Sequence, residues 1–345
     1  MDKEISIFYK NRVLVAKSRL DRSFRNFEYI NSKLDMLRGK IRSLLFTKGN
    51  NLVEVELYVF NSNEINSLAK RELNGYAIAF SSAIFENIPE DLNNYFFHAD
   101  IRKFFYGSKK NVYFHIEKLM DYMLIFLCLH EYYHILNGHC DLSISFGHRI
   151  ETMASLSEDE NRINQILEYD ADFCAARSSV YILLEQASCQ EDRVMNYTFL
   201  GFAMYYLFLR FEEQGYENLK LCIDNLWEND HPFASIRIVY ILLIITNYYI
   251  DYGIDKHELS DVLINTIHAC LYFDRIYYDS DTLEKSLIAL GFTEEGLRHI
   301  ENLNNGWDGV KNSLKEYAFI ELREIMHFQI KDKAWISRDG HFINR

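Results

Sequence analysis

The sequence predicts a mostly helical α+β fold, in which a small sheet packs on a pair of long helices beside a helical C-terminal region. Three observations support this prediction. Apolar and polar residues alternate only in a short region between residues 51 and 80. Apolar stretches long enough for buried helices follow from residue 112 onward. The 345-residue chain contains only two prolines, Pro89 and Pro232, so little interrupts its helices.

Residues 1–50 form a basic segment, with 12 Lys/Arg against 5 Asp/Glu in a chain whose net charge is −13. Its apolar residues recur at helical spacing, namely Leu20, Phe24, Phe27, Ile30, Leu34, Leu37 and Ile41. One interpretation is an arm that binds nucleic acid or an acidic partner. The other, which we favour, is an amphipathic helix packed on the acidic remainder. The sequence pI of 5.4 argues against nucleic-acid binding by the rest of the protein.

The remaining elements follow in order along the chain. Residues 51–60 and 75–80 are predicted strands, and residues 61–74 between them are expected to be turn and irregular chain. Long helices are predicted at residues 112–136, ending at Asn137-Gly138, and at residues 158–184. From residue 197 onward nearly everything is predicted to be helical. We therefore divide the chain into a basic helical arm (1–50), a domain carrying the candidate site (51–240) and a helical C-terminal region packed on it (241–345).

Composition predicts a cytoplasmic protein without a membrane partner. Hydrophobic residues make up 49% and charged residues 25%, as in soluble globular proteins. Six scattered cysteines without a CxxC pair favour reduced thiols. The opening sequence MDKEISIFYK lacks the apolar core of a secretory signal. The apolar segments 196–209 and 238–250 end at charges short of the length that a bilayer requires, so we expect buried helices there.

The stretch LCLHEYYHILNGHC places His130 and His134 four residues apart, on one face of a predicted helix. In the HExxH pattern two such imidazoles bind Zn²⁺, and the glutamate between them, here Glu131, acts as general base. The alternative is a pair of core histidines that match the pattern by chance. Zinc needs a third protein ligand, and His139 lies one residue short of the position that a metzincin requires.

The segment EYDAD offers that third ligand on the second long helix. Glu168 and Asp172 are four residues apart and share a helical face, so Glu168 could complete a His₂Glu site. Asp172 could accept the N–H of a ligand histidine and fix its tautomer. Taken alone, ExxxD is more typical of a solvated acidic stripe. Its apolar and small neighbours favour the ligand interpretation here.

Three segments in order, HEYYHILNGH, EYDAD and HPFASIR, resemble the motifs of gluzincin metallopeptidases of the HtpX heat-shock and CAAX prenyl protease group. Within this group the chain looks most like the soluble prophage-encoded peptidases of phage exclusion, the Lit type. The resemblance covers about residues 53–240, with NSLA where the family has Asn-Ala-Phe-Ala. It implies a zincin core, a Zn²⁺ cofactor and cleavage of a specific intracellular protein in stress response or anti-phage defence.

The resemblance also implies roles for individual residues. The zinc ligands would be His130, His134 and Glu168. Glu131 would take a proton from the attacking water, and His231, with Arg237 as runner-up, would stabilise the oxyanion. The alternative is that His231-Pro232 merely starts a helix and Arg237 pairs with a carboxylate.

Further roles concern the surroundings of the site. Asn66 would hold the substrate backbone, and the strand Tyr76–Phe80, through Tyr76, Ala77 and Ile78, would pair with an extended peptide. His139 is expected to support the site rather than to bind metal. The loop Asp141–Ser157 is either a lid or a plain connector.

Two other functions stay open at this stage. The chain could be a protease toxin or effector that is controlled by an activator or inhibitor protein. It could also be a non-catalytic binding module in which zinc is structural. That module would need a closed shell of four ligands, with His139 or Cys140 as the fourth.

Overall fold

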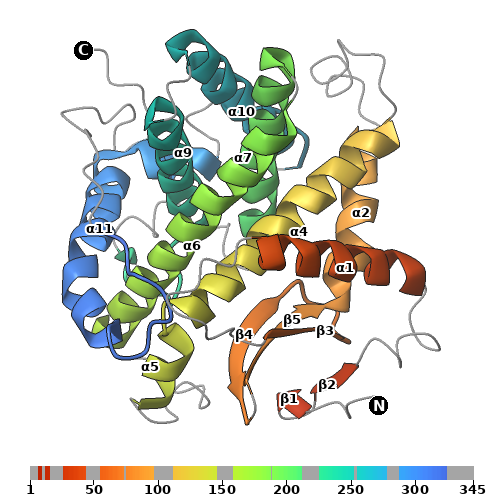
Figure 1. The fold of residues 1–345 in the computed structure, drawn as a ribbon. Coiled ribbons are helices and arrows are strands. Elements are labelled where there is room, and N and C mark those ends of the chain that lie inside the picture. The colour runs from red at the N-terminus through yellow and green to blue at the C-terminus, as the bar shows by residue number, and fades with distance from the viewer. Residues whose placement is uncertain are drawn as a thin grey trace.

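The computed structural model is mostly helical with one small mixed sheet, which confirms the predicted α+β class (Figure 1). It describes residues 7–9, 12–15, 26–43, 55–73, 75–96, 112–145, 158–187, 189–211, 225–251, 255–277 and 287–324. The strands are β1 (Ile7–Tyr9), β2 (Arg12–Val15), β3 (Val55–Phe60), β4 (Ser67–Glu72) and β5 (Gly75–Ser81). The helices are α1 (Phe27–Ser43), α2 (Ser82–Phe96), α4 (Val112–Leu136), α5 (His139–Ser145), α6 (Glu158–Gln186), α7 (Gln190–Phe211), α9 (Ala234–Asp251), α10 (Lys256–Tyr277), η6 (Leu287–Phe292) and α11 (Glu294–Leu314).

The sheet has the strand order β1-β2-β3-β5-β4, and β3, β5 and β4 form its main part. β3 and β5 run parallel, whereas β4 runs antiparallel to β5 and lies at the edge of the described sheet. We expected residues 61–74 to be turn and irregular chain, which is confirmed for residues 61–66 and corrected by β4 for residues 67–72. The β4 sequence SLAKRE lacks the apolar alternation of a half-buried strand. Pairing with β5 therefore decides its conformation.

Side chains alternate between the two faces of this sheet, as the pleat of a β-strand requires. One set joins the main hydrophobic core, namely Leu57, Val59, Ile78 and Phe80. The other set forms a small separate cluster, namely Tyr58, Phe60, Ala77 and Ala79. Of the two long helices, α4 packs on the sheet against β4 and β5, and α6 packs on α4.

The two long predicted helices are α4 and α6, and they pack against each other. The second half of α4 is buried except at Tyr133 and His134, which are partly exposed, as its mostly apolar sequence predicts. It ends at Asn137-Gly138, which confirms the predicted stop signal. Gly138 has a φ of +81°, and a Cβ at this position would lie 2.6 Å from Tyr317 Cβ. Both the backbone conformation and the close approach of the later chain therefore require glycine here.

The described parts of the basic segment are β1, β2 and α1, so residues 7–9 and 12–15 are strands rather than part of the predicted helical arm, and α1 packs on α4. The buried residues of α1 are Ile30, Leu34, Leu37 and Ile41. Lys33 Nζ lies 2.6 Å from a carboxylate oxygen of Glu117 and 2.6 Å from one of Asp121, both on α4. For residues 27–43 the structure thus supports a packed amphipathic helix rather than a free arm. Leu20 and Phe24 lie outside the described residues.

Buried residues of all three predicted regions belong to one hydrophobic cluster, which includes Ile30, Leu129 and Leu322. Every residue from Asn196 to Leu209 in α7 is buried, as predicted for this apolar segment. Among the described helices we find none with the length and apolar character needed to cross a membrane.

Candidate metal centre

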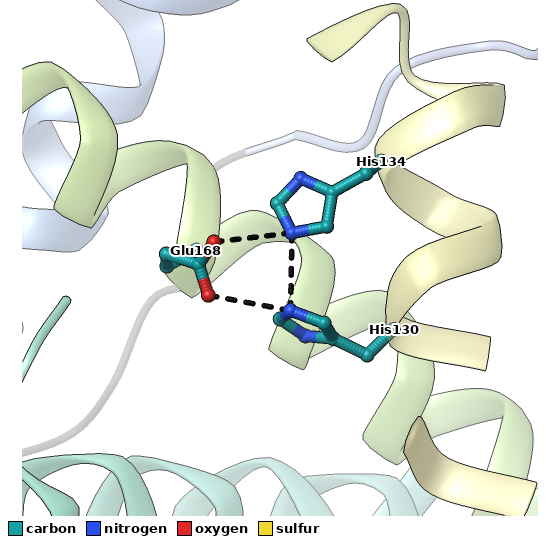
Figure 2. A group of neighbouring side chains, drawn as sticks. All are labelled: His130, His134 and Glu168. Atoms are coloured by element: carbon teal, nitrogen blue, oxygen red, sulfur yellow. Dashed lines mark hydrogen bonds and ion pairs between the residues drawn. The ribbon is translucent and has the colours of Figure 1, made fainter. Parts of the chain in front are cut away.

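Two histidines of α4 and one glutamate of α6 converge on a common point (Figure 2). His130 Nε2 lies 3.0 Å from His134 Nε2, since the two rings project from successive turns of the same helical face. The Glu168 carboxylate spans both imidazoles, with Oε2 3.2 Å from His130 Nε2 and Oε1 3.2 Å from His134 Nε2. The structure thus brings together the three predicted ligand residues, which are 38 positions apart at most.

This group fits a tetrahedral zinc ion by both chemistry and spacing. Zinc binds imidazole nitrogen and carboxylate oxygen at about 2.0–2.2 Å, so neighbouring ligand atoms of a tetrahedron lie about 3.3–3.5 Å apart. The observed separations of 3.0–3.2 Å are slightly shorter than this edge and need only a small outward movement. His130 and Glu168 also line a cavity of about 740 Å³. An ion held by these residues would therefore be accessible from the cavity.

The buried carboxylate of Asp172 orients His130 through the ring nitrogen Nδ1, on the side away from Glu168. His130 Nδ1 lies 2.8 Å from Asp172 Oδ1, and Asp172 is fully buried. Arg237 donates to both oxygens of Asp172 at 2.8 Å, and the Tyr240 hydroxyl donates to Oδ2. Burial raises the pKa of Asp172, but Arg237 and His130 outweigh it and hold the pKa below its usual range. An ionised Asp172 holds a proton of His130 on Nδ1, so Nε2 is the nitrogen that would bind a cation, which would displace the Nε2 proton.

A second buried carboxylate, that of Asp170, supports His134 indirectly, through His139. His139 Nδ1 lies 2.9 Å from His134 Nδ1, and His139 Nε2 lies 3.3 Å from Asp170 Oδ2. Burial lowers the pKa of His139 despite the nearby Asp170, which favours the neutral imidazole. His139 thus contacts the Nδ1 side of His134, outside the convergent group of His130, His134 and Glu168. This placement agrees with the predicted supporting role and argues against His139 as a fourth ligand.

Sequence reasoning missed Asp170 and its partners. Asn137 Nδ2 donates to Asp170 Oδ2 at 2.6 Å, and Arg323 Nε donates to Asp170 Oδ1 at 2.6 Å. Asp170 stands inside the EYDAD segment, but nothing in the local sequence separates its role from that of Asp172. Arg323 lies 153 positions further along the chain, so only the folded chain brings it to the site.

Glu131 lies beside this group and lines the same cavity. The Ser67 hydroxyl of β4 donates to Glu131 Oε1 at 2.6 Å. Ser67 occupies the second position of NSLA, where the resembling family has alanine. A side chain of the edge strand therefore holds the candidate general base, a contact that the sequence did not reveal.

Neighbouring charges shift the pKa values of Glu168 and His130 in this group. Burial raises the pKa of Glu168, but His231, His134 and His130 outweigh it and hold the pKa well below its usual range. Burial lowers the pKa of His130, yet Glu168 and Asp172 raise it to about 10. A Glu168 carboxylate that stays ionised is the form that binds a metal ion.

His231 and Arg237 are placed differently from each other. His231 stands in the segment before α9, half exposed, with Nε2 3.5 Å from Glu168 Oε1 and Nδ1 2.7 Å from Asp230 Oδ1. The carboxylate of Glu168, and after it that of Asp230, raises the pKa of His231 to about 9. Arg237 is buried and engaged with Asp172 through two hydrogen bonds. The structure therefore agrees with the alternative prediction, in which Arg237 pairs with a carboxylate, here that of Asp172.

The predicted peptide-binding strand needs a correction. β5 pairs with β3 on one side and β4 on the other, so its backbone hydrogen bonds are already used. Ala77 and Ile78 are buried, and the Tyr76 hydroxyl donates to Asp141 Oδ2. None of these three residues lines the cavity. The strand beside the cavity with an edge unpaired in the described sheet is β4.

Asn66 precedes β4 and lines the cavity, as a substrate-binding residue would. Its backbone is fixed by Ser81, whose N–H donates to Asn66 O at 2.8 Å and whose hydroxyl accepts from Asn66 N at 3.0 Å. The predicted lid or connector Asp141–Ser157 begins within α5, and residues 146–157 lie outside the described residues.

Comparisons with known proteins add no family. No protein-family model, curated protein or solved structure matches the chain. The resemblance to gluzincin peptidases therefore stays a prediction from the order of the motifs, and the chemistry of the site rests on its own geometry.

Proposed function

We infer that this protein is a zinc-dependent endopeptidase that cleaves a specific intracellular protein. The observation that carries the proposal is the convergence of His130, His134 and Glu168 next to Glu131, on the wall of one cavity. Nε2 of each imidazole and the Glu168 carboxylate would hold Zn²⁺. When bound, zinc supplies Lewis-acid chemistry, acidifying water and polarising a carbonyl.

Glu131 performs the proton transfers of this proposal. It takes a proton from water as the water oxygen adds to the peptide carbonyl carbon. It then gives that proton to the amide nitrogen as the carbon–nitrogen bond breaks, so that one peptide and one water yield a carboxylic acid and an amine. His231, with its raised pKa and its place on the cavity wall, supplies positive charge for the developing oxyanion.

Substrate binding belongs to β4 rather than β5 in this proposal. An extended peptide that adds to the outer edge of β4 would lie along the cavity beside Glu131. Asn66 stands at the start of this edge. The biological setting, stress response or anti-phage defence in the cytoplasm, follows from the resemblance of the motifs.

A direct test compares wild type with Glu131→Gln, which removes the base but preserves the shape of the side chain. We expect both purified proteins to hold one zinc per chain by elemental analysis. In cells, proteome-wide identification of N-termini should find new termini with wild type only. Equal sets of termini from both proteins, together with zinc far below one per chain, would rule the proposal out.

A further inference from the structure

The chain after α11 returns to the end of α4 and packs against it. Phe319 N donates to Leu136 O at 2.8 Å, and Tyr317 lies against Gly138 so closely that a Cβ there would clash. In Figure 1 this stretch is the dark blue segment that follows α11, and it runs beside α5 and α11. This stretch thus packs on the turn Asn137-Gly138, directly before His139 at the start of α5.

Arg323 in this stretch is a buried arginine with a fixed position. Its side chain is 6% exposed and packs on three aromatic rings, with the guanidinium 4.3 Å from the ring centre of Phe173 and 4.9 Å from that of Trp307. The ring centre of Tyr169 lies 5.1 Å away. Trp307 Nε1 also donates to Arg323 O at 3.0 Å. Aromatic stacking and the backbone contact together aim Nε of this arginine at Asp170.

We propose that Arg323 is a positioning residue of the metal centre, which acts through Asp170 and His139 on the ligand His134. This inference rests on the metal site of the proposed function. His139 Nε2 lies 3.3 Å from Asp170 Oδ2, and this carboxylate favours a proton on Nε2, so that Nδ1 of His139 keeps its lone pair. That lone pair accepts the Nδ1–H of His134, 2.9 Å away, and leaves His134 Nε2 unprotonated toward Glu168 and the ion.

The two ligand histidines are therefore supported in parallel ways. Behind His130 stand Asp172 and Arg237, and Arg237 belongs to α9. Behind His134 stand His139, Asp170 and Arg323, and Arg323 belongs to the stretch after α11. Each imidazole is thus oriented by a buried carboxylate that a buried arginine holds in place. The C-terminal region, outside the reach of the motif resemblance, would in this way set the metal affinity.

The test measures zinc affinity by competition with a chelator, for wild type, Asp170→Asn, Arg323→Met and the double variant. Loss of such supporting groups weakens metal binding about ten- to hundredfold, and we expect this for Asp170→Asn and about tenfold for Arg323→Met. The double variant should bind zinc no more weakly than Asp170→Asn, because Arg323 acts through Asp170. The double variant also removes both buried charges and leaves neither one unpaired. We therefore expect it to fold, so that its zinc affinity can be measured. Arg323→Lys, which retains the charge, should recover part of the affinity.

Arg193→Met is the matched control. Arg193 donates to both oxygens of Glu258 at 2.8 and 3.1 Å, a similar arginine–carboxylate pair between α7 and α10, away from the site. The Arg193→Met variant should have a lower unfolding midpoint in urea than wild type and an unchanged zinc affinity. With Co²⁺ in place of zinc, the visible spectrum should change in Asp170→Asn but not in the control.

Each outcome decides a separate question. Wild-type affinity in Asp170→Asn and Arg323→Met, or a double variant whose losses add, would overturn the positioning role while leaving the metal site intact. Failure of wild type itself to bind zinc or Co²⁺ would overturn both this inference and the proposed function.

Discussion

The hydroxyl of Ser67 donates a hydrogen bond of 2.6 Å to Oε1 of Glu131. Ser67 begins the edge strand β4, and Glu131 lies between the two histidines of α4, so the contact joins the candidate substrate strand to the candidate base. Ser67 therefore fixes the orientation of the carboxylate that the proposed reaction needs.

Replacing this serine tests that role. Ser67→Ala frees the Glu131 carboxylate to rotate, and we expect kcat to fall about tenfold, equivalent to about 1.4 kcal/mol of barrier, with KM unchanged. Ser67→Thr retains the hydroxyl and should restore most of the rate. Steady-state kinetics on a cleaved peptide would provide the measurement. A Ser67→Ala enzyme as fast as wild type would show that the hydrogen bond does not position the base.

Zinc should stabilise the fold measurably. A ligand that binds only the native state adds about 4 kcal/mol to the free energy of unfolding at a thousand times its dissociation constant. Thermal unfolding of chelator-treated protein, with and without added zinc, should therefore show a higher midpoint with zinc. Glu168→Ala removes the third ligand and should abolish most of this increase. The same increase in wild type and variant would place the stabilising ion elsewhere.

Arg237 should contribute mainly to stability rather than to catalysis. Arg237→Met leaves the fully buried Asp172 without its bidentate partner, and we expect the free energy of unfolding to fall by about 3–5 kcal/mol. Tyr240→Phe removes one hydrogen bond to the same carboxylate and should cost about 1–3 kcal/mol. Urea unfolding with chelator present separates these effects from metal binding. A stable Arg237→Met protein with a large loss of kcat would instead favour the oxyanion role.

The buried His299 should make the folded protein less stable in acid. Burial lowers its pKa to about 4 from an ordinary value of about 6.5, and its Nε2 lies 2.9 Å from Gln165 Oε1. Between these pH values the unfolded chain binds a proton that the native protein does not. The free energy of unfolding therefore falls as the pH drops from 6.5 to 4, with a slope of up to about 1.4 kcal/mol per pH unit from this group.

The control for this effect is His299→Gln, which cannot titrate. The difference in unfolding free energy between wild type and His299→Gln, measured in urea at pH 4 to 7, should change steadily below pH 6.5. It should be constant above pH 7. A difference that stays constant over the whole range would contradict the assignment of this acid sensitivity to His299.

Local sequence was sufficient for the elements that carry the site. Uniform apolarity predicted α4, and Asn137-Gly138 predicted its end, because a positive φ at Gly138 is a local property of the backbone. Four-residue spacing placed His130 and His134 on one face for the same reason. Glu168 was found because it lies on the second long predicted helix, α6, which packs on α4.

Other parts of the site were beyond local reasoning. β4 has no alternating pattern of its own, so the irregular chain predicted at residues 61–74 was wrong for residues 67–72. The choice of Tyr76–Phe80 as a peptide-binding strand failed for a related reason, since the central position of β5 depends on which strands pair with it. Nothing near Ser67 in the sequence indicates Glu131, 64 positions away.

The sequence by itself determined which residues could coordinate a metal and on which helical faces they lie, because helix geometry relates residues three or four positions apart. Only the tertiary structure decided which carboxylates support the histidines, which strand borders the cavity, and that Arg323 reaches Asp170. Those contacts join segments far apart in the chain. They depend on how buried surfaces pack together, and no short stretch of sequence contains that information.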